Sequence, residues 1–205
     1  MLLEIVGEVL VGFEEGSGTI LVLLDMSAAF DTVDIPQLLS VLEDEIGLKG
    51  TVLRWFKSFL LDRKQKVVIK GQLSEVLLTL YGVPQGSVLG PVLFNIYVRS
   101  LPDFIKNHDF RSSMYADDSN ARFKFSLKFQ VHNTAVKVLN LIKNISTWMD
   151  KHFLKLTPSK TELILFSPPH TKHDPKLHGT FIDNSCIRFS SNIKLLGVSL
   201  DSNNL

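Results

Sequence analysis

Hydrophobic and polar positions along the chain predict a sheet with helices packed against it. A continuous apolar run after a glycine, residues 19–24 (TILVLL), suits a strand that is buried on both faces. Residues 131–149 place apolar side chains at spacings of three and four, which predicts one long amphipathic helix. Similar patterns predict helices at 1–13, 36–46, 49–61 and 88–101, hairpins at 66–80 and 111–125, and a strand at 162–166. Residues 181–189 and 193–200 continue the β pattern. This order of elements favours a mixed α/β fold.

Composition limits the classes of protein that fit this pattern. The chain has 205 residues, of which 45% are hydrophobic, enough for one substantial core. Its one cysteine, Cys186, excludes an internal disulfide and fits a reducing compartment. No apolar run reaches the roughly 18 residues that a membrane span needs, and the first residues lack the basic start of a signal peptide. We therefore expect no membrane partner. The sequence does not say where the protein resides; an intracellular place, in the nucleus or the cytoplasm, fits these observations.

The net charge of +1 conceals a strong asymmetry between the two ends of the chain. Residues 1–50 hold ten acidic residues and one basic residue, whereas residues 51–205 hold eleven acidic and twenty-one basic residues. A basic excess of this kind is compatible with nucleic-acid contact by the later part of the chain. Solvated helix faces would explain the same charges, so composition alone leaves both interpretations open.

The segment MYADDSN (114–120) sets Asp117 and Asp118 side by side after an aromatic residue. One interpretation is a polar hairpin turn, because Asp tolerates left-handed backbone geometry. The other is a cation site. Asp25 ends the first buried strand, and if that strand pairs with the 111–125 hairpin, the three carboxylates converge at one sheet edge. Clustered acids are costly unless a cation compensates them, and two Mg²⁺ ions about 4 Å apart can clamp an in-line displacement at phosphorus.

Five segments resemble, in this order, the sequence blocks of the reverse transcriptase of non-LTR retrotransposons. They are LLDMSAAFDTVD (23–34), YGVPQGSVLGPVLFNIYV (81–98), MYADDSN (114–120), WMDKHFLKLTPSKTELILF (148–166) and IKLLGVSLD (193–201). The second block is the most specific, and it is similar to the jockey and chicken-repeat-like branch. The resemblance extends over about residues 15–201. It implies an RNA-directed DNA polymerase palm, an antiparallel-rich sheet packed on helices with the metal site on one face.

The resemblance implies a role for each carboxylate. Asp25 and Asp117 match the family's two metal-binding residues, and Asp118 supports the site beside them. Two Mg²⁺ ions are the implied cofactors, and Mn²⁺ could replace them. Phe30 matches the bulky residue that blocks a ribose 2′-OH and so selects deoxynucleotides. The alternative for Phe30 is an ordinary core side chain.

Other residues match the blocks that handle substrate. Gln85 would lie near the incoming nucleotide, and Gly86 would allow close approach. Lys160 matches a lysine near the triphosphate, where it could give a proton to the leaving pyrophosphate. The alternative for Lys160 is a solvated loop lysine. Leu196 and Gly197 fall in a block that resembles the primer grip.

The implied partners are an RNA template, a DNA primer and deoxynucleoside triphosphates. Arg63, Lys64 and Lys66 could contact the template backbone, although surface solvation explains each of them as well. The family's polymerase has a fingers region before the Asp25 block and a thumb after the Gly197 block. We therefore expect a single truncated domain with fingers and thumb largely missing. It would comprise a helical lead-in (1–18), a palm core (19–166) and C-terminal β segments (167–205).

Three functions remain open at this point. The first is templated transfer of deoxynucleotides onto a primer 3′-OH, weak or absent in so short a chain. The second is a retrotransposon-derived fragment that binds nucleic acid and does not polymerise. The third is a metal-dependent nuclease on a similar sheet, which would leave the match of Phe30 to a nucleotide-selecting residue unexplained.

Overall fold

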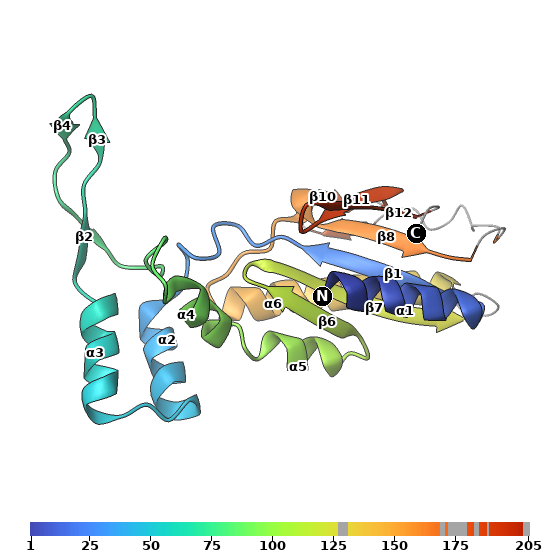
Figure 1. Ribbon diagram of the computed structural model, residues 1–205, viewed down its shortest axis with the longest axis horizontal. Coiled ribbons are helices and arrows are strands. Elements are labelled where there is room, and N and C mark those ends of the chain that lie inside the picture. The colour runs from blue at the N-terminus through green and yellow to red at the C-terminus, as the bar shows by residue number, and fades with distance from the viewer. Residues whose placement is uncertain (127–130, 169–170, 172–179, 183–184, 188, 203–205) are drawn as a thin grey trace. The chain divides into compact units, whose positions relative to one another are not determined.

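The computed structural model describes the chain except for residues 127–130, 169–170, 172–179, 183–184, 188 and 203–205 (Figure 1). The described residues form two compact units. Unit 1 comprises residues 1–27, 100–150 and 155–205, and unit 2 comprises residues 28–99 and 151–154. Among the described helices, none has both the length and the apolarity that a membrane span requires.

The centre of unit 1 is a four-stranded antiparallel sheet with the strand order β6-β7-β1-β8 (Figure 1). Its strands are β1 (Ser17–Leu24), β6 (Arg111–Tyr115), β7 (Asp118–Ser126) and β8 (Glu162–Phe166). Neighbours on both sides and layers on both faces leave little of β1 exposed, which explains its continuous apolar sequence. Residues 19–24 pair with the hairpin, which meets the condition for the three carboxylates to converge.

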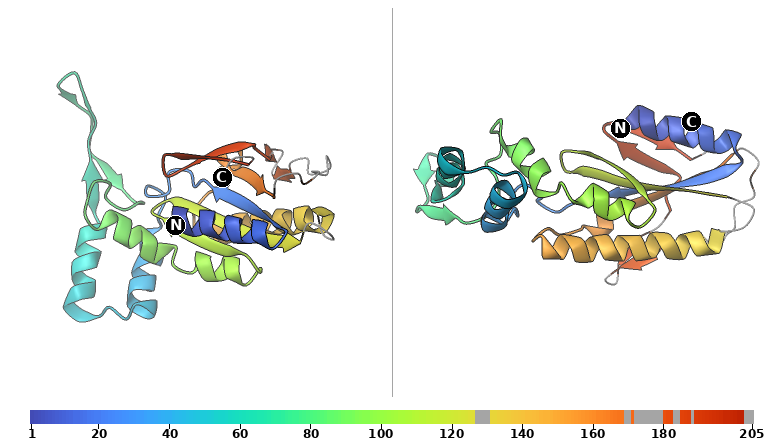
Figure 2. Two further views of the ribbon diagram at one scale, coloured as in Figure 1. Left: turned by 45° about the vertical axis from the view of Figure 1, so that its right-hand side comes forward. Right: turned by 90° about the horizontal axis from the view of Figure 1, so that it is seen from below.

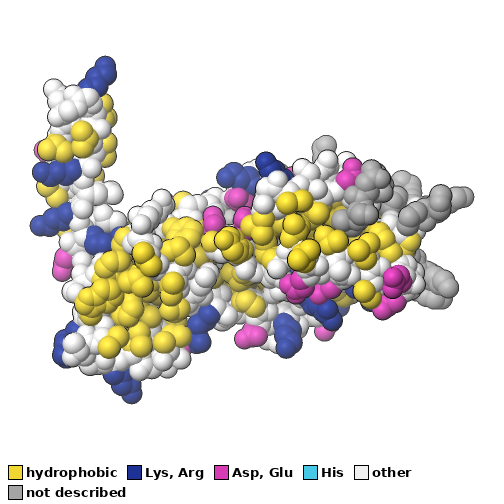
Figure 3. All heavy atoms as spheres, viewed as in Figure 1, with side chains coloured by type: hydrophobic (Ala, Val, Ile, Leu, Met, Phe, Trp, Pro, Cys, Tyr) yellow, Lys and Arg dark blue, Asp and Glu magenta, His cyan; other side chains and the backbone are white. Residues whose placement is uncertain are grey.

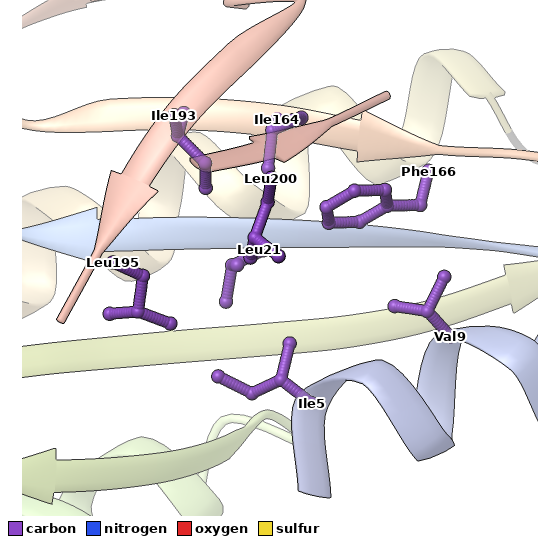
Figure 4. Packing of buried hydrophobic residues seen from close by; sticks show 8 residues of the cluster. All are labelled: Ile5, Val9, Leu21, Ile164, Phe166, Ile193, Leu195 and Leu200. Atoms are coloured by element: carbon purple, nitrogen blue, oxygen red, sulfur yellow. The ribbon is translucent and has the colours of Figure 1, made fainter. Parts of the chain in front are cut away.

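Helices α1 (Leu2–Glu14) and α6 (Val131–Lys151) lie on opposite faces of this sheet (Figure 2, right). On the α1 face, the hairpin of β11 (Asn192–Leu195) and β12 (Val198–Asp201) completes a hydrophobic core (Figure 4). The buried residues of this core are Ile5, Val9, Leu21, Ile164, Phe166, Ile193, Leu195 and Leu200.

The opposite face is covered by the apolar stripe of α6. The predicted repeat is confirmed from Val138 onwards, since Val138, Ile142, Ile145 and Met149 are all buried. Ala135 is partly buried, and the side chain of Val131 lies outside the described residues. Helix α5 packs beside α6 through the rings of Phe104 and Trp148, whose centroids are 6.3 Å apart. The remaining elements of unit 1 are α5 (Leu101–Lys106), the 3-10 turn η2 (Pro158–Lys160), β9 (Thr180–Ile182) and β10 (Ser185–Ile187).

A buried polar cluster joins α1 to the β6–β7 hairpin. Arg122 of β7 is only 3% exposed. Its guanidinium donates to Glu4 and, at 2.7 Å, to Glu8 Oε2, both on α1. It also donates to Ser113 Oγ at 2.7 Å and to Asn120 Oδ1 at 3.1 Å. Since the carboxylates compensate the buried charge and the other acceptors take further N–H groups, the cluster fixes the helix against the hairpin.

Unit 2 consists of helices and a two-stranded ribbon. Its helices are α2 (Ile35–Ser40), the π-helical turn η1 (Val41–Glu45), α3 (Gly50–Leu60) and α4 (Gly90–Tyr97). The ribbon pairs β2 (Arg63–Gln65) with β5 (Leu77–Thr79), and β3 (Val68–Ile69) with β4 (Gln72–Leu73). It exposes a run of apolar side chains, visible at the upper left of Figure 3: Val67, Val68, Ile69, Leu73, Val76, Leu77, Leu78 and Leu80.

Tyr97 connects three parts of unit 2. Its hydroxyl lies 2.8 Å from Gln37 Oε1 and 2.6 Å from the carbonyl oxygen of His152, and the Asp34 N–H donates to it. Burial raises the pKa of Tyr97 to about 12, so the hydroxyl stays protonated at neutral pH. Residues 151–154, which are the last residue of α6 and the three residues after it, belong to this unit.

The predicted single helix over residues 88–101 is wrong. The structure has two helices, α4 and α5, separated by residues 98–100. Pro102 lies in the first turn of α5. Proline has no N–H with which to continue a helix, so it is tolerated in a first turn and not in an interior.

Candidate active site

Asp25 is the first residue after β1, and the backbone around it is held by a second segment. The Thr157 N–H donates to the Asp25 carbonyl oxygen at 2.8 Å, and the Ser27 N–H donates to the Lys155 carbonyl oxygen at 2.9 Å. The hydroxyls of Ser27 and Thr157 are 2.6 Å apart. Because both sides of this pairing are fixed, Asp25 has a defined position at the end of the central strand.

Asp117 and Asp118 lie at the tip of the β6–β7 hairpin. Tyr115 pairs with Asp118, which leaves a two-residue loop in which Ala116 has a φ of 53°. β7 also pairs with β1, and the last pair joins Leu24 to Ser119. One further step in this register sets Asp118 opposite Asp25. The turn and the carboxylate cluster are therefore the same feature, at the end of the two central strands rather than at a lateral edge.

The carboxylates interact electrostatically. Burial raises the pKa of Asp118, and the negative charges of Asp117 and Asp25 raise it further. Asp25 Oδ2 is buried, and no group in the described part of the chain makes a hydrogen bond to it. A buried carboxylate oxygen that accepts no hydrogen bond and lies beside two further acids favours a cation nearby.

Lys160 supplies one positive charge at this position. It ends the η2 turn, and its Nζ lies 3.7 Å from Asp25 Oδ2. The side chain is 69% exposed, so the ion pair is screened by water and adds little stability. The ammonium group can therefore leave Asp25 for another anionic partner with little loss of stability.

The donor set fits a divalent cation that also binds substrate. In the ranges that the structure describes, no three His, Cys, Asp or Glu side chains gather closely enough to hold a metal ion by themselves. Mg²⁺ usually takes one or two protein carboxylates and completes its coordination with water and substrate phosphates. Asp25 and the Asp117–Asp118 pair could supply such a partial set of hard oxygen ligands.

The predicted nucleotide-binding residues lie in unit 2. The ring of Phe30 packs against Phe94 with a centroid distance of 4.8 Å, and the Phe30 carbonyl oxygen accepts a hydrogen bond from the Val83 N–H at 2.8 Å. Gln85 is exposed in the loop that precedes α4. Gly86 has a φ of 75°, and a Cβ added there would meet no atom within 4 Å. Gly86 therefore leaves open space on its side of the loop.

Arg63 contributes to this loop in a way that the sequence did not indicate. Its guanidinium donates to the carbonyl oxygens of Leu60, Tyr81 and Gly82, so it joins the end of α3 to the loop. Burial lowers the pKa of Arg63. Lys64 and Lys66, which we also predicted as nucleic-acid contacts, are exposed on the ribbon.

Leu196 and Gly197 form the turn of the β11–β12 hairpin in unit 1. Both have a positive φ, 49° and 82° respectively, the backbone conformation that two-residue hairpin turns with a right-handed twist require. The residues that anchor this hairpin, Leu195 and Leu200 among them, lie in the core under α1. The predicted primer-grip segment is thus a tight turn on an anchored hairpin.

The fold and the carboxylate pair at the end of its central strands can now be compared with known proteins. Residues 5–200 match the family described as reverse transcriptase (RNA-dependent DNA polymerase), and the chain belongs to this family. It is 29% identical over 190 residues to the "Probable RNA-directed DNA polymerase from transposon BS" of Drosophila melanogaster. The alignment covers 88% of this chain and 20% of that protein.

A second relative indicates the same branch. The chain is 28% identical over 183 residues to the "RNA-directed DNA polymerase from mobile element jockey" of Drosophila funebris. The alignment covers 87% of this chain and 19% of that protein. The predicted resemblance to jockey-type non-LTR elements is confirmed. The chain spans about a fifth of the length of these curated relatives.

Solved structures share the fold. Telomerase from Candida tropicalis, truncated from its C-terminal domain, aligns with a TM-score of 0.64 at 15% identity and covers all of this chain and 39% of that one. Telomerase from Candida albicans, in complex with a fragment of telomeric RNA, aligns with a TM-score of 0.63 at 13% identity and covers 98% of this chain and 33% of that one. At these identities the likeness establishes the fold alone, which is the predicted α/β polymerase palm.

Proposed function

We propose that this chain is the catalytic palm of an RNA-directed DNA polymerase, which adds deoxynucleotides to a primer 3′-OH on an RNA template. The observation that carries the proposal is the proximity of Asp25 and Asp118 at the end of the central strands, where the charge of Asp25 helps to raise the pKa of Asp118. There a buried carboxylate oxygen of Asp25 has no hydrogen-bond partner among the described residues and lies beside Lys160. A site with this charge and these ligands suits chemistry on phosphate groups.

The carboxylates would hold the metal ions. In this proposal Asp25 and Asp117 bind two Mg²⁺ ions, or Mn²⁺ in their place, and Asp118 supports them. Ions bound there would activate the primer hydroxyl and stabilise the charge that develops on the leaving oxygen. The raised pKa of Asp118 is consistent with this role, because the energy stored in carboxylate repulsion is released when a cation binds.

The remaining candidate residues act on the nucleotide. Lys160, with its exposed and weakly paired ammonium group, gives a proton to the leaving pyrophosphate. Phe30, whose ring is held by Phe94, excludes a ribose 2′-OH by steric contact. Gln85 and Gly86 form the loop surface near the nucleotide. Lys64 and Lys66 contact the template backbone and contribute affinity that falls with salt.

Primer extension tests the proposal. The chain, with Mg²⁺ and dTTP on a poly(rA)·oligo(dT) template, is expected to incorporate nucleotides, and Asp117→Asn is expected to abolish incorporation. Replacing one ligand oxygen by an amide nitrogen removes a metal ligand and leaves the side-chain size unchanged. Asp150→Asn, an equivalent change at an exposed position near the end of α6, is the matched control and should extend like the unmodified chain.

Incorporation that survives Asp117→Asn would contradict the assigned role of Asp117. A chain that binds the template–primer in a gel-shift assay but does not extend it would favour the alternative of a non-catalytic nucleic-acid-binding fragment. Since the chain spans about a fifth of its curated relatives, the assay should also be run on a longer version. Activity confined to that version would place the missing contacts outside these residues.

A further inference from the structure

Gln85 is exposed, and yet its side chain is held by a specific partner. Its Nε2 donates to Asp31 Oδ1 at 2.8 Å, across 54 positions of sequence. Asp31 directly follows Phe30. The carboxylate is an acceptor only, so this hydrogen bond determines which end of the Gln85 amide points towards Asp31.

The backbones that carry these two side chains are fastened together. The Gly82 N–H donates to the Val33 carbonyl oxygen at 2.8 Å, next to the bridge that pairs Asp34 with Tyr81. Gly82 has a φ of 78°, and a Cβ there would come within 2.7 Å of the Asp31 Cα. The loop thus packs directly on the Asp31 backbone, and only a glycine permits this approach.

Arg63 fixes the same loop from the ribbon. It donates to the carbonyl oxygens of Tyr81 and Gly82, and together with Asp31 and Gln85 it lines a cleft of about 500 Å³. Several independent contacts therefore fix the backbones that carry the Asp31 carboxylate and the Gln85 amide. A side chain so placed can determine the orientation of its neighbour before any ligand arrives.

We propose that Asp31 is the positioning residue of Gln85. By accepting one Gln85 N–H, it turns the amide so that the Oε1 oxygen is presented in one fixed orientation to the incoming deoxynucleotide. Without Asp31 the Gln85 amide could present either its oxygen or its nitrogen to the nucleotide. The side chain would then be ordered only when the nucleotide binds, and this loss of conformational entropy would weaken binding. The inference rests on the proposed function, because it takes the nucleotide as the ligand of the Gln85 loop.

The first measurement is independent of catalysis. Nuclear magnetic resonance of the ¹⁵N-labelled chain reports the side-chain NH₂ group of Gln85. In the unmodified chain we expect two widely separated proton shifts, because only one of the protons is hydrogen-bonded to a carboxylate. Addition of Mg²⁺·dTTP with poly(rA)·oligo(dT) should perturb both. In Asp31→Ala the two shifts should move together, and the affinity for dTTP should fall about tenfold, the loss expected for a hydrogen bond to a charged group.

Asp31→Asn serves as the second variant, because it keeps the side-chain volume and separates positioning from folding. Its amide can present either end to Gln85, so the loss of dTTP affinity should be intermediate. Glu75→Ala, which removes an exposed carboxylate elsewhere in unit 2, is the control and should leave the affinity unchanged. In the double variant Asp31→Ala, Gln85→Ala, the loss should not exceed that of Gln85→Ala alone, because Asp31 acts through Gln85.

The possible outcomes separate this inference from the proposed function. If the chain binds dTTP as expected but does not extend a primer, the polymerase proposal fails and the positioning role stands. Equal dTTP affinities for the unmodified chain and Asp31→Ala would overturn the positioning role, as would additive losses in the double variant. Gln85 resonances that do not respond to millimolar dTTP would overturn it too. In an extending chain, Asp31→Ala should raise KM and leave kcat within about twofold.

Discussion

The environment of the Asp118 carboxylate disfavours its negative charge. Asp118 lies at the start of strand β7, next to the last residue pair between β7 and β1. Without bound cations, two further carboxylates lie near the Asp118 carboxylate. Burial and these charges raise its pKa above the ordinary value of 3.8. The fold therefore holds this carboxylate in a position that disfavours its charged form.

Replacement of Asp118 by Asn should therefore stabilise the metal-free protein at neutral pH. Because the pKa is higher in the folded state, the folded state binds the extra proton, and stability falls as the pH rises above 3.8 through the folded pKa. Asp118→Asn has no such titrating group, so it does not lose stability in this way. In urea unfolding it should be more stable than the unmodified protein at pH 7, and this difference should be absent below pH 3.8.

Urea unfolding in millimolar Mg²⁺ is a second test of the same variant. Binding to the folded state should raise the unfolding midpoint of the unmodified protein more than that of Asp118→Asn. Asp150→Asn should respond like the unmodified protein. A stability difference between Asp118→Asn and the unmodified protein that is the same at every pH would contradict the electrostatic explanation.

Single residues also show what the sequence could and could not predict. Asp25 and Asp117 were identifiable because strand ends and hairpin tips follow from local patterns, and the pairing of two strands then brought them together. The contact between Asp31 and Gln85, and the hydrogen bonds of Arg63 to the loop, join distant segments. No periodicity indicates such contacts. The one available signal, an acidic residue beside the aromatic Phe30, fits many other arrangements.

At the scale of elements, the hairpin that carries the carboxylates depends on α1. Arg122 on β7 is buried against Glu4 and Glu8 of that helix. Burial raises the pKa of Glu8, but hydrogen bonds from Arg122 and Arg111 outweigh it and lower the pKa overall. This part of the stability is present at neutral pH and is lost as the pH falls through the folded pKa of Glu8.

Arg122→Met should destabilise the protein by about 3 kcal/mol, because it removes the buried cation of the cluster and leaves the partly buried Glu8 with only the exposed Arg111. Lys124→Met, two residues further along the same strand, breaks an exposed ion pair with Glu15 and should cost less than about 1 kcal/mol. Urea denaturation of both variants measures the difference. Equal losses would mean that burial does not strengthen the Arg122 cluster.

Most elements could be predicted because their periodicity is local. The strand at 162–166 has the predicted bounds, and the long helix follows its apolar stripe. The division of residues 88–101 into two helices was missed, because their hydrophobic pattern continues through the break and only Pro102 marks the restart. The ribbon was predicted as a hairpin, but its exposure was not, since its apolar residues resemble those of a buried strand.

At the scale of the whole molecule, the two units should differ in local stability. β1 is buried between neighbouring strands, whereas β3 and β4 form an exposed pair. An isolated two-stranded ribbon is marginally stable in water. Hydrogen exchange should therefore be slowest at the amides of β1 and β7 and fast at those of β3 and β4.

Measurement by mass spectrometry at several protein concentrations tests this expectation. Slow exchange in the ribbon that disappears on dilution would indicate that its exposed apolar residues associate with another chain. Slow exchange that persists on dilution would contradict the predicted difference between the ribbon and the sheet.

The return of residues 151–154 to unit 2 has a consequence for shuffling of segments between related genes. A crossover that exchanged residues 28–99 as one cassette would set a foreign residue 97 against the native His152 carbonyl oxygen, which lies 2.6 Å from the Tyr97 hydroxyl. If the incoming residue lacked a hydroxyl, that carbonyl oxygen would lose a hydrogen-bond donor, a mismatch that is invisible in either parental sequence. Viable chimeras should therefore take residues 28–99 and residues 151–154 from the same parent.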